Sequence, residues 1–275
     1  MSGKRDTQAA GLDPYALMAR FYDADYKAAG SVDDIAFYSS IAKELGEPVL
    51  EMGCGSGRNL LPIARFGIAI HGIDASPAML RVLRGKLRLE PPRVRRRTRV
   101  SQGDIRSTHI GGRYGLVTAP FRVAQHLLRP GDRRAWLRNV ARHLEPAGRL
   151  CFDVVNPGPD LLSHPCEEAG VIVRPLSTGR LVVRSVSTRP RTDSGMIEVR
   201  YKWQVKDARG TPVGEWRTRL VFHLYSRPEL EALLESQGFE IVSYWGSFKR
   251  EPFGPHSTDH VILSRLRPRC SPPGH

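Results

Sequence analysis

The stretch Val49-Leu50-Glu51-Met52-Gly53-Cys54-Gly55-Ser56-Gly57 decides the fold of this chain. Its apolar start, together with Pro48, predicts a short strand that runs directly into a glycine turn, and Arg58 to Phe66 then predicts a helix. A strand, a glycine turn and a helix in this order let a ligand approach bare backbone at the carboxyl edge of a parallel sheet. Glycine is required there because a side chain would block the approach or forbid the φ angles of the turn.

Outward from this unit, strands and helices alternate as far as Val155, which predicts a parallel α/β sheet. The strands are expected at 68–73, 98–101, 114–118 and 149–155, and the helices at 31–46, 76–89 and 133–144. The pattern then changes, because residues 171–224 hold strand-like runs separated by turn signals, which predicts antiparallel strands. Ser226 and Glu229 form a capping box that opens a further helix, and the last two strands follow at 239–245 and 261–266.

Three carboxylates in and after the predicted strands indicate what the glycine turn binds. Asp74 ends the second strand, where a carboxylate accepts both ribose hydroxyls of an adenosine group. Asp104 ends the third strand, within reach of an adenine amino group. Glu51 places negative charge where the pyrophosphate of NAD or FAD would lie, and so favours a ligand with a cationic amino group. The spacing Gly-x-Gly-x-Gly, in place of Gly-x-Gly-x-x-Gly, also argues against an NAD-dependent oxidoreductase.

Four motifs stand in the same order as in a known family. They are Glu51 to Gly57, Gly72 to Leu80, Gly103-Asp104-Ile105 and Leu144 to Leu150. With these motifs, residues 20–155 resemble the class I S-adenosylmethionine-dependent methyltransferases, and 226–266 resembles that family's closing helix and hairpin. The resemblance implies an enzyme that uses S-adenosylmethionine. It also implies an α/β fold: a Rossmann-like, doubly wound, mostly parallel seven-stranded sheet with an inserted antiparallel β lid.

The motifs and the strand patterns together divide the chain into five parts. They are a disordered start at 1–12, an N-terminal helical flap at 13–46, the S-adenosylmethionine-binding α/β domain at 47–160 and 225–267, inserted antiparallel strands at 161–224, and a loose tail at 268–275. We expect the inserted strands to serve as a lid over the substrate.

The resemblance also implies cofactor contacts. Glu51 would lie near the amino group of the methionine part, Asp74 would bind the ribose, and Asp104 would hold the adenine edge with Ile105. Phe121, after the fourth strand, would lie near the sulfonium. The other matched positions around the methionine and the adenine are Gly53, Cys54, Gly55, Gly57, Ala75 and Met79. Ordinary core packing is the alternative for Met79 and Ile105.

The segment after the fourth strand, Ala119-Pro120-Phe121-Arg122-Val123-Ala124-Gln125-His126-Leu127, bears on the methyl acceptor. It lacks the Asn/Asp-Pro-Pro-Tyr/Phe motif of adenine-N6 and glutamine methyltransferases. Pro165-Cys166 resembles the Pro-Cys pair of cytosine-C5 enzymes but stands in the wrong segment, after the fifth strand. The segment is more similar to small-molecule methyltransferases, including amino-sugar N-methyltransferases.

Those small-molecule enzymes also carry an N-terminal Tyr-Asp-x-x-Tyr segment, which here is Tyr22-Asp23-Ala24-Asp25-Tyr26. By that resemblance, Tyr22 would contact the methionine end of the cofactor, and Tyr26 would point at the acceptor as a catalytic residue. His126 would lie at the rim of the acceptor pocket as the general base, because histidine titrates near the working pH. Core packing is the alternative for both tyrosines, and capping or packing for His126. We expect direct methyl transfer to N or O of a small-molecule acceptor.

The charge of the chain leaves a second function open. Its 42 Lys and Arg against 28 Asp and Glu give a net charge of +14 and a pI of about 10.1, which suits an RNA substrate. An rRNA or tRNA methyltransferase is therefore an alternative, as is a non-catalytic S-adenosylmethionine-binding protein. Against RNA, the arginines are spread along the whole chain and no nucleic-acid-binding appendage is evident.

The remaining sequence features argue against several classes of protein. No apolar run reaches the roughly 18 residues of a membrane helix, and the N-terminus has no secretory signal. The four cysteines stand far apart, so no disulfide scaffold is indicated and a cytoplasmic location is expected. His256-x-x-x-His260 has no third ligand, so no metal site is predicted. The basic run Arg93 to Arg99 is expected to be a solvated connection, and a monomer or a homodimer fits equally.

Overall fold

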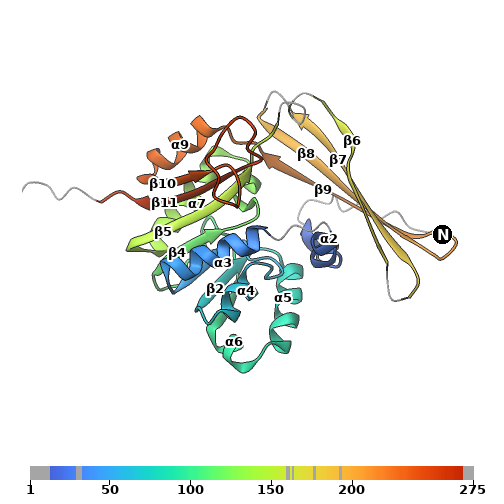
Figure 1. Cartoon of the computed structure of the whole chain (residues 1–275), viewed down its shortest axis with the longest axis horizontal. Coiled ribbons are helices and arrows are strands. Elements are labelled where there is room, and N and C mark those ends of the chain that lie inside the picture. The colour runs from blue at the N-terminus through green and yellow to red at the C-terminus, as the bar shows by residue number, and fades with distance from the viewer. Residues whose placement is uncertain are drawn as a thin grey trace, which may run out of the picture.

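The computed structural model describes residues 13–28, 33–158, 162, 164–175, 178–191 and 194–268. The expected disordered start at 1–12 lies outside these described residues, and so does the predicted tail beyond residue 268. The boundaries between the five parts expected from the sequence stay a prediction. Two sheets organise the described residues, and they lie at an angle to each other (Figure 1).

The larger sheet has seven strands in the order β10-β11-β5-β4-β1-β2-β3. They are β1 (Val49–Met52), β2 (Ile70–Asp74), β3 (Thr98–Gln102), β4 (Tyr114–Ala119), β5 (Leu144–Val155), β10 (Phe239–Trp245) and β11 (Asp259–Leu266). The first five pair in parallel, whereas β11 pairs antiparallel with both β5 and β10. The predicted fold class is therefore confirmed. Strands β1 and β4 meet at the centre, so their carboxyl ends form the ligand-binding edge.

Helices cover both faces of this sheet, and successive residues of β1 show why. Val49 packs in one core with Ile41 and Leu83, whereas Leu50 packs in another with Trp136 and Leu230. A strand buried on both faces needs apolar side chains at consecutive positions. On one face lie α3 (Asp33–Leu45), α4 (Leu60–Arg65), α5 (Pro77–Leu89) and α6 (Pro92–Arg97), and on the other α7 (Pro130–His143) and α9 (Arg227–Ser236).

The smaller sheet is wholly antiparallel, in the order β6-β7-β8-β9. Its strands are β6 (Cys166–Pro175), β7 (Leu181–Arg191), β8 (Met196–Lys206) and β9 (Pro212–His223). Along β8, Ile197 and Val199 face a cavity, whereas Arg200 between successive inner positions is exposed. This period of two gives the sheet an apolar inner face and a charged outer face.

Two short helices fill the angle between the sheets: α1 (Tyr15–Met18) and α2 (Tyr22–Ala28) (Figure 1). Met18 joins a small core with Trp203 and Leu220 on the inner face of the second sheet. The indole Nε1 of Trp203 donates a hydrogen bond of 2.7 Å to Asp25 in α2. The N-terminal helices are therefore packed against the smaller sheet as well as against the glycine turn described below.

Local structure departs from the sequence expectations at two places. The segment around Arg95 is a helix, α6, because Pro92 starts the helix and Val94 is buried in the core; the expected connection at Arg93 to Arg99 is wrong in this respect. At α9, Ser226 Oγ accepts the Glu229 amide as predicted. The Glu229 carboxylate, however, pairs with Arg133 of α7 and His223 of β9, so it ties three elements together.

Candidate active site

The glycine turn between β1 and α4 has three left-handed residues, Gly53, Gly55 and Gly57, with φ of +76°, +51° and +80°. A Cβ at Gly53 would lie 2.5 Å from Val123, and one at Gly57 would lie 2.3 Å from Leu83. A Cβ at Gly55 would meet nothing closer than 3.8 Å. Close packing therefore requires glycine at the first and third positions, and only Gly55 leaves bare backbone open toward a ligand.

A cavity of about 700 Å³ runs along the carboxyl ends of the central strands, beside this turn. All but one of the cofactor residues predicted from the sequence line it. They are Tyr22, Glu51, Gly53, Cys54, Gly55, Asp74, Ala75, Met79, Asp104, Ile105 and Phe121, with Gly57 the one exception. Among the lining residues, Met79 and Cys54 are themselves buried, so core packing explains part of their presence.

Asp74 connects the turn to the next helix. Its Oδ2 accepts the Gly55 amide and its Oδ1 accepts the Ser76 amide, both at 2.8 Å. Burial raises the pKa of this carboxyl, while the two amides partly offset that effect. One acid therefore fixes the backbone on both sides of the cavity and retains lone pairs for a ligand hydroxyl.

Glu51 is a buried acid at the base of the same cavity. Burial, together with the nearby carboxylates of Asp74 and Asp34, raises its pKa well above the usual range. Its Oε2 atom is buried and has no hydrogen-bond partner in the structure. An orphaned buried acceptor is costly unless a ligand pairs with it, so this position fits a cationic amino group.

Asp104 lines the cavity, but its carboxylate is bonded to a neighbouring arginine, which the sequence did not predict. Its carboxylate accepts the backbone amide and the guanidinium of Arg106, with Asp104 Oδ1 2.9 Å from Arg106 Nε. The guanidinium also bonds Asp132 at 2.8 Å and holds the pKa of Asp104 below its usual range. Asp104 therefore lines the cavity with a carboxylate that is already paired with Arg106.

Several cavity residues were not predicted from the sequence. The Arg58 guanidinium forms a bidentate salt bridge with Asp34 and lies 4.6 Å from the centre of the Phe121 ring. Asp13 accepts the Ser76 hydroxyl at 2.5 Å, and Asp23 accepts the Ser56 hydroxyl at the same distance. Each contact joins the N-terminal flap to a cofactor-side loop. Only the tertiary fold brings these pairs together, although the acids of the flap are visible in the sequence.

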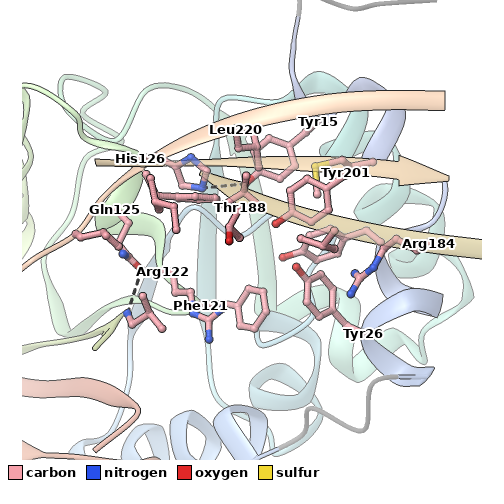
Figure 2. Close-up of a pocket in the computed structure, with 18 residues that line it drawn as sticks. Tyr15, Tyr26, Phe121, Arg122, Gln125, His126, Arg184, Thr188, Tyr201 and Leu220 are labelled. Atoms are coloured by element: carbon pink, nitrogen blue, oxygen red, sulfur yellow. Dashed lines mark hydrogen bonds between the residues drawn. The ribbon is translucent and has the colours of Figure 1, made fainter. Parts of the chain in front are cut away.

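A second cavity of about 310 Å³ lies under the inner face of the smaller sheet (Figure 2). Four aromatic residues line both this cavity and the first one: Tyr15, Tyr22, Phe121 and His126. Tyr26 lines the second cavity alone, with its ring centre 4.8 Å from that of Phe121. Rings contributed by α1, α2 and the segment after β4 therefore separate two adjoining spaces.

The segment after β4 adopts an unusual backbone. Phe121 and Arg122 both have left-handed φ, +60° and +67°, which residues with a side chain rarely adopt. Asp153 in β5 stabilises this turn, because its carboxylate accepts the Phe121 amide at 2.7 Å and the Arg122 amide at 3.0 Å. The Tyr38 hydroxyl donates a third bond at 2.6 Å. Burial raises the pKa of Asp153 to about 6.

His126 lies at the boundary of the two cavities, where its Nε2 is 2.8 Å from the Tyr15 hydroxyl. Burial lowers the pKa of His126 to about 4. The expectation that this imidazole titrates near neutral pH is therefore wrong, since desolvation disfavours its charged form. Burial also raises the pKa of Tyr26, so both side chains are uncharged at neutral pH.

The described part of the chain offers neither a metal site nor a membrane-spanning helix. No group of three or more His, Cys, Asp or Glu side chains there could hold a metal ion. None of its helices has both the length and the apolar character needed to cross a membrane. The described cysteines Cys54, Cys151 and Cys166 are free thiols.

Comparison with known proteins gives a consistent result. Residues 50–150 match the family described as "Methyltransferase domain". A cypemycin N-terminal methyltransferase of Streptomyces sp is 25% identical over 236 residues, 83% of this chain and 87% of the relative. The CcbJ methyltransferase of Streptomyces caelestis superposes with a TM-score of 0.75 at 23% identity, over 93% of this chain and 99% of that one. The sugar N-methyltransferase KedS8 of Streptoalloteichus sp gives a TM-score of 0.70 at 20% identity, over 96% and 98%.

Proposed function

Because this chain is an S-adenosylmethionine-dependent methyltransferase with the class I fold, we propose that it methylates an enclosed small-molecule acceptor directly. The observation that carries the proposal is the second cavity, which adjoins the cofactor cavity across Tyr15, Tyr22, Phe121 and His126. Its volume of about 310 Å³ is at the lower end of the range for small-molecule sites. The sugar N-methyltransferase KedS8, which methylates nitrogen by name, supports an amine acceptor.

S-adenosylmethionine supplies a methyl group on a sulfonium, which is a good leaving group. We propose that Glu51 pairs with the amino group of the cofactor through its orphaned Oε2, and that Asp74 binds the ribose hydroxyls. Arg58 would face the carboxylate of the methionine part, because it lines this cavity beside the glycine turn. Asp104, Ile105, Ala75 and Met79 would surround the adenine. Phe121 and Tyr22 would lie beside the sulfonium.

Transfer of this kind depends mainly on position and on a dry site. The aromatic boundary contributes to both, since Tyr15 and Tyr22 are half-buried and desolvation raises their pKa values well above the usual range. A histidine with a pKa of about 4 is a weak base, so His126 suits an acceptor that arrives as an uncharged amine rather than an alcohol. We propose that His126 and Tyr26 orient the acceptor by hydrogen bonds.

A binding experiment tests the cofactor half of the proposal. The melting temperature is measured with S-adenosylmethionine, S-adenosylhomocysteine and NAD in parallel. A ligand at about 100 times its Kd adds roughly 2.7 kcal/mol, which for a chain of this size is about 5–10 °C. We expect a shift with the two sulfur ligands and none with NAD. A shift with NAD alone would contradict the proposal.

An activity experiment tests the acceptor half. Formation of S-adenosylhomocysteine is followed with a panel of small amines and phenols, and with tRNA and rRNA as the alternative substrates. We expect turnover with an amine. Binding to RNA that falls steeply with salt, together with methylated RNA, would instead support the RNA alternative. A cytoplasmic location and a monomeric or dimeric state remain parts of the proposal for fractionation and light scattering to test.

A further inference from the structure

The second cavity has a distinctive charge. Two guanidinium groups line it, those of Arg122 and Arg184, and no carboxylate side chain is present among the described residues of its wall. Figure 2 shows Arg122 beside Phe121 and Arg184 beside Tyr26. Burial raises the pKa of Tyr26 and of Tyr201, and the charges of both arginines partly offset that rise. The two cations therefore act on the same small volume.

The side chains of β7 alternate between the two faces of the smaller sheet, and Arg184 is on the inner face. Val182, Arg184, Val186 and Thr188 occupy successive inward positions, so a charged side chain stands where apolar ones are the rule. Its guanidinium carbon lies 5.5 Å from the centre of the Tyr26 ring. The Nε atom is buried and has no hydrogen-bond partner among the described residues. An inward cation with an unmet donor costs stability unless a ligand pairs with it.

Arg122 reaches the cavity from the opposite wall. Its backbone is fixed by the bond from its amide to Asp153, so its left-handed turn aims the side chain at the acceptor space. The nearest carboxylate oxygen in an ion pair is Asp259 Oδ1, 3.9 Å from Arg122 Nη2. That separation is too long for a hydrogen bond, so the guanidinium retains donors for a ligand.

Thr188 provides a third polar group in the same space. Its Oγ1 is buried without a hydrogen-bond partner in the structure. Thr188 is on the same strand and the same face as Arg184, two residues beyond Val186. Two unmet buried groups on one strand face are a sign of a built binding site rather than of chance exposure.

We propose that the methyl acceptor carries a compact anionic group, a carboxylate or a phosphate, which Arg184 and Arg122 bind while its apolar body lies against Val199 and Leu220. This rests on the proposed function and names the substrate class for the same site. Guanidinium forks match the geometry of both anions. The same two cations also disfavour protonation of a neighbouring acceptor amine, which keeps that amine nucleophilic.

The test uses the full chain saturated with S-adenosylhomocysteine, at constant ionic strength. The probes are benzoate, phenyl phosphate and the neutral analogue benzamide, titrated while the melting temperature is followed. We expect benzoate or phenyl phosphate to bind with a Kd at least about tenfold below that of benzamide, since a hydrogen bond to a charged group is stronger than one to a neutral group. Preference for benzoate identifies a carboxylate acceptor, and preference for phenyl phosphate identifies a phosphate ester.

Variants make the test specific to this pair of arginines. Arg184→Gln should remove the preference for the anion, Arg184→Lys should retain part of it, and Arg122→Gln should reduce it less because Asp259 already shares that cation. Arg189→Gln is the matched control, because Arg189 is exposed and lies on the outer face of the same strand.

Two results would overturn the inference: equal affinity for benzamide and both anions, or an anion preference that survives in Arg184→Gln. Failure of S-adenosylhomocysteine itself to stabilise the chain would instead count against the proposed function. The two failures are therefore distinguishable. Should Arg184→Gln not fold, Arg184→Lys and Arg122→Gln still decide the outcome.

Discussion

The two adjoining cavities differ in charge and in how their walls are made. The cofactor cavity is lined by the acids Asp13, Glu51, Asp74 and Asp104, and its two arginines, Arg58 and Arg106, are each paired with a carboxylate. The acceptor cavity has arginines and no acid among its described lining residues. A cationic ligand is thus favoured on one side of the aromatic boundary and an anionic ligand on the other. The charge of the lining residues therefore changes sign across the boundary over which we propose methyl transfer.

The walls differ in origin as well. The cofactor cavity is formed chiefly by loops that follow parallel strands, so a few contiguous motifs supply most of it. The acceptor cavity is formed by alternate residues of β7, β8 and β9 together with α1, α2 and the turn after β4. The first arrangement is fixed by local backbone geometry, and the second by packing between distant segments. Each can be disturbed separately, and the expected effects differ in size.

Replacing Asp74 should have the largest effect on cofactor affinity. Asp74→Ala removes the acceptor for the Gly55 and Ser76 amides and the proposed partner of the ribose. The two hydrogen bonds proposed from the ribose hydroxyls to this charged group are worth about 3–6 kcal/mol together. Affinity for S-adenosylhomocysteine should therefore fall by at least about 100-fold. Calorimetric titration measures this. The control is Asp33→Ala, an exposed acid in the first turn of α3, and equal affinity in the two variants would contradict the prediction.

Replacing Asp153 should lower stability and kcat/KM, because Asp153 supports the turn that lines the acceptor cavity. In Asp153→Asn, only one of the two side-chain atoms still accepts a hydrogen bond, so either the Phe121 or the Arg122 amide faces an NH₂ group. We expect a loss of about 1–3 kcal/mol in unfolding free energy and up to about 100-fold in kcat/KM, because displaced reacting groups transfer poorly. Affinity for S-adenosylhomocysteine should change little. A selective loss of cofactor affinity would contradict this division.

The same variant yields a pH signature. Because the pKa of Asp153 is raised to about 6 in the folded protein, from an ordinary value near 3.8, the folded state holds the proton more tightly than the unfolded state. Its contribution to stability is therefore largest below pH 4 and is lost as the pH rises to 6, by about 3 kcal/mol. Denaturant unfolding at several pH values, compared between wild type and Asp153→Asn, measures this difference. A constant difference from pH 4 to 7 would refute it.

A smaller effect is expected at the boundary between the cavities. Tyr15→Phe removes the partner of His126 Nε2 and should cost about 1 kcal/mol of stability and a few-fold in kcat/KM. Since burial keeps the pKa of His126 near 4, the pH profile of kcat/KM should contain no inflection between pH 5.5 and 7.5 that depends on this residue. An inflection there that disappears in His126→Asn would restore the general-base role predicted from the sequence.

The smallest effect is expected at the contact between the flap and the glycine turn. Ser56→Ala removes the 2.5 Å bond from the Ser56 hydroxyl to Asp23, which also pairs with Lys86. One such bond is worth about 1 kcal/mol, so release of S-adenosylhomocysteine should accelerate by about fivefold. Stopped-flow displacement measures the rate. Ser40→Ala serves as control, because the Ser40 hydroxyl bonds Glu44 on the exposed face of α3, and unchanged release in both variants would disprove the role of this contact.

The sequence predicted the cofactor side well for a physical reason. A strand, a glycine turn and an acid at the end of the next strand are local patterns, and parallel pairing brings their carboxyl ends together. Even there, packing modified the result: Gly53 and Gly57 are glycines because of Val123 and Leu83, and Asp104 is paired with Arg106.

The acceptor side was predicted only in outline. Strand-like runs separated by turn signals indicated the strands of the smaller sheet, but they do not tell which face turns inward, so Arg184 remained one arginine among many. Asp153 carried a weak signal, an acid inside the apolar strand Leu150 to Val155. That signal did not reveal the left-handed turn across the sheet that the acid supports. The pKa of His126 depends on desolvation by distant segments, which no local pattern indicates.

The flap has a consequence for the order in which substrates combine. Tyr15 and Tyr22 from α1 and α2 belong to the walls of both cavities, while Asp13 and Asp23 attach these helices to loops on the cofactor side. A flap fastened to those loops completes the floor of the acceptor cavity. S-adenosylmethionine should therefore bind first and S-adenosylhomocysteine should leave last. In steady-state kinetics, inhibition by S-adenosylhomocysteine should then be competitive with S-adenosylmethionine and noncompetitive with the acceptor.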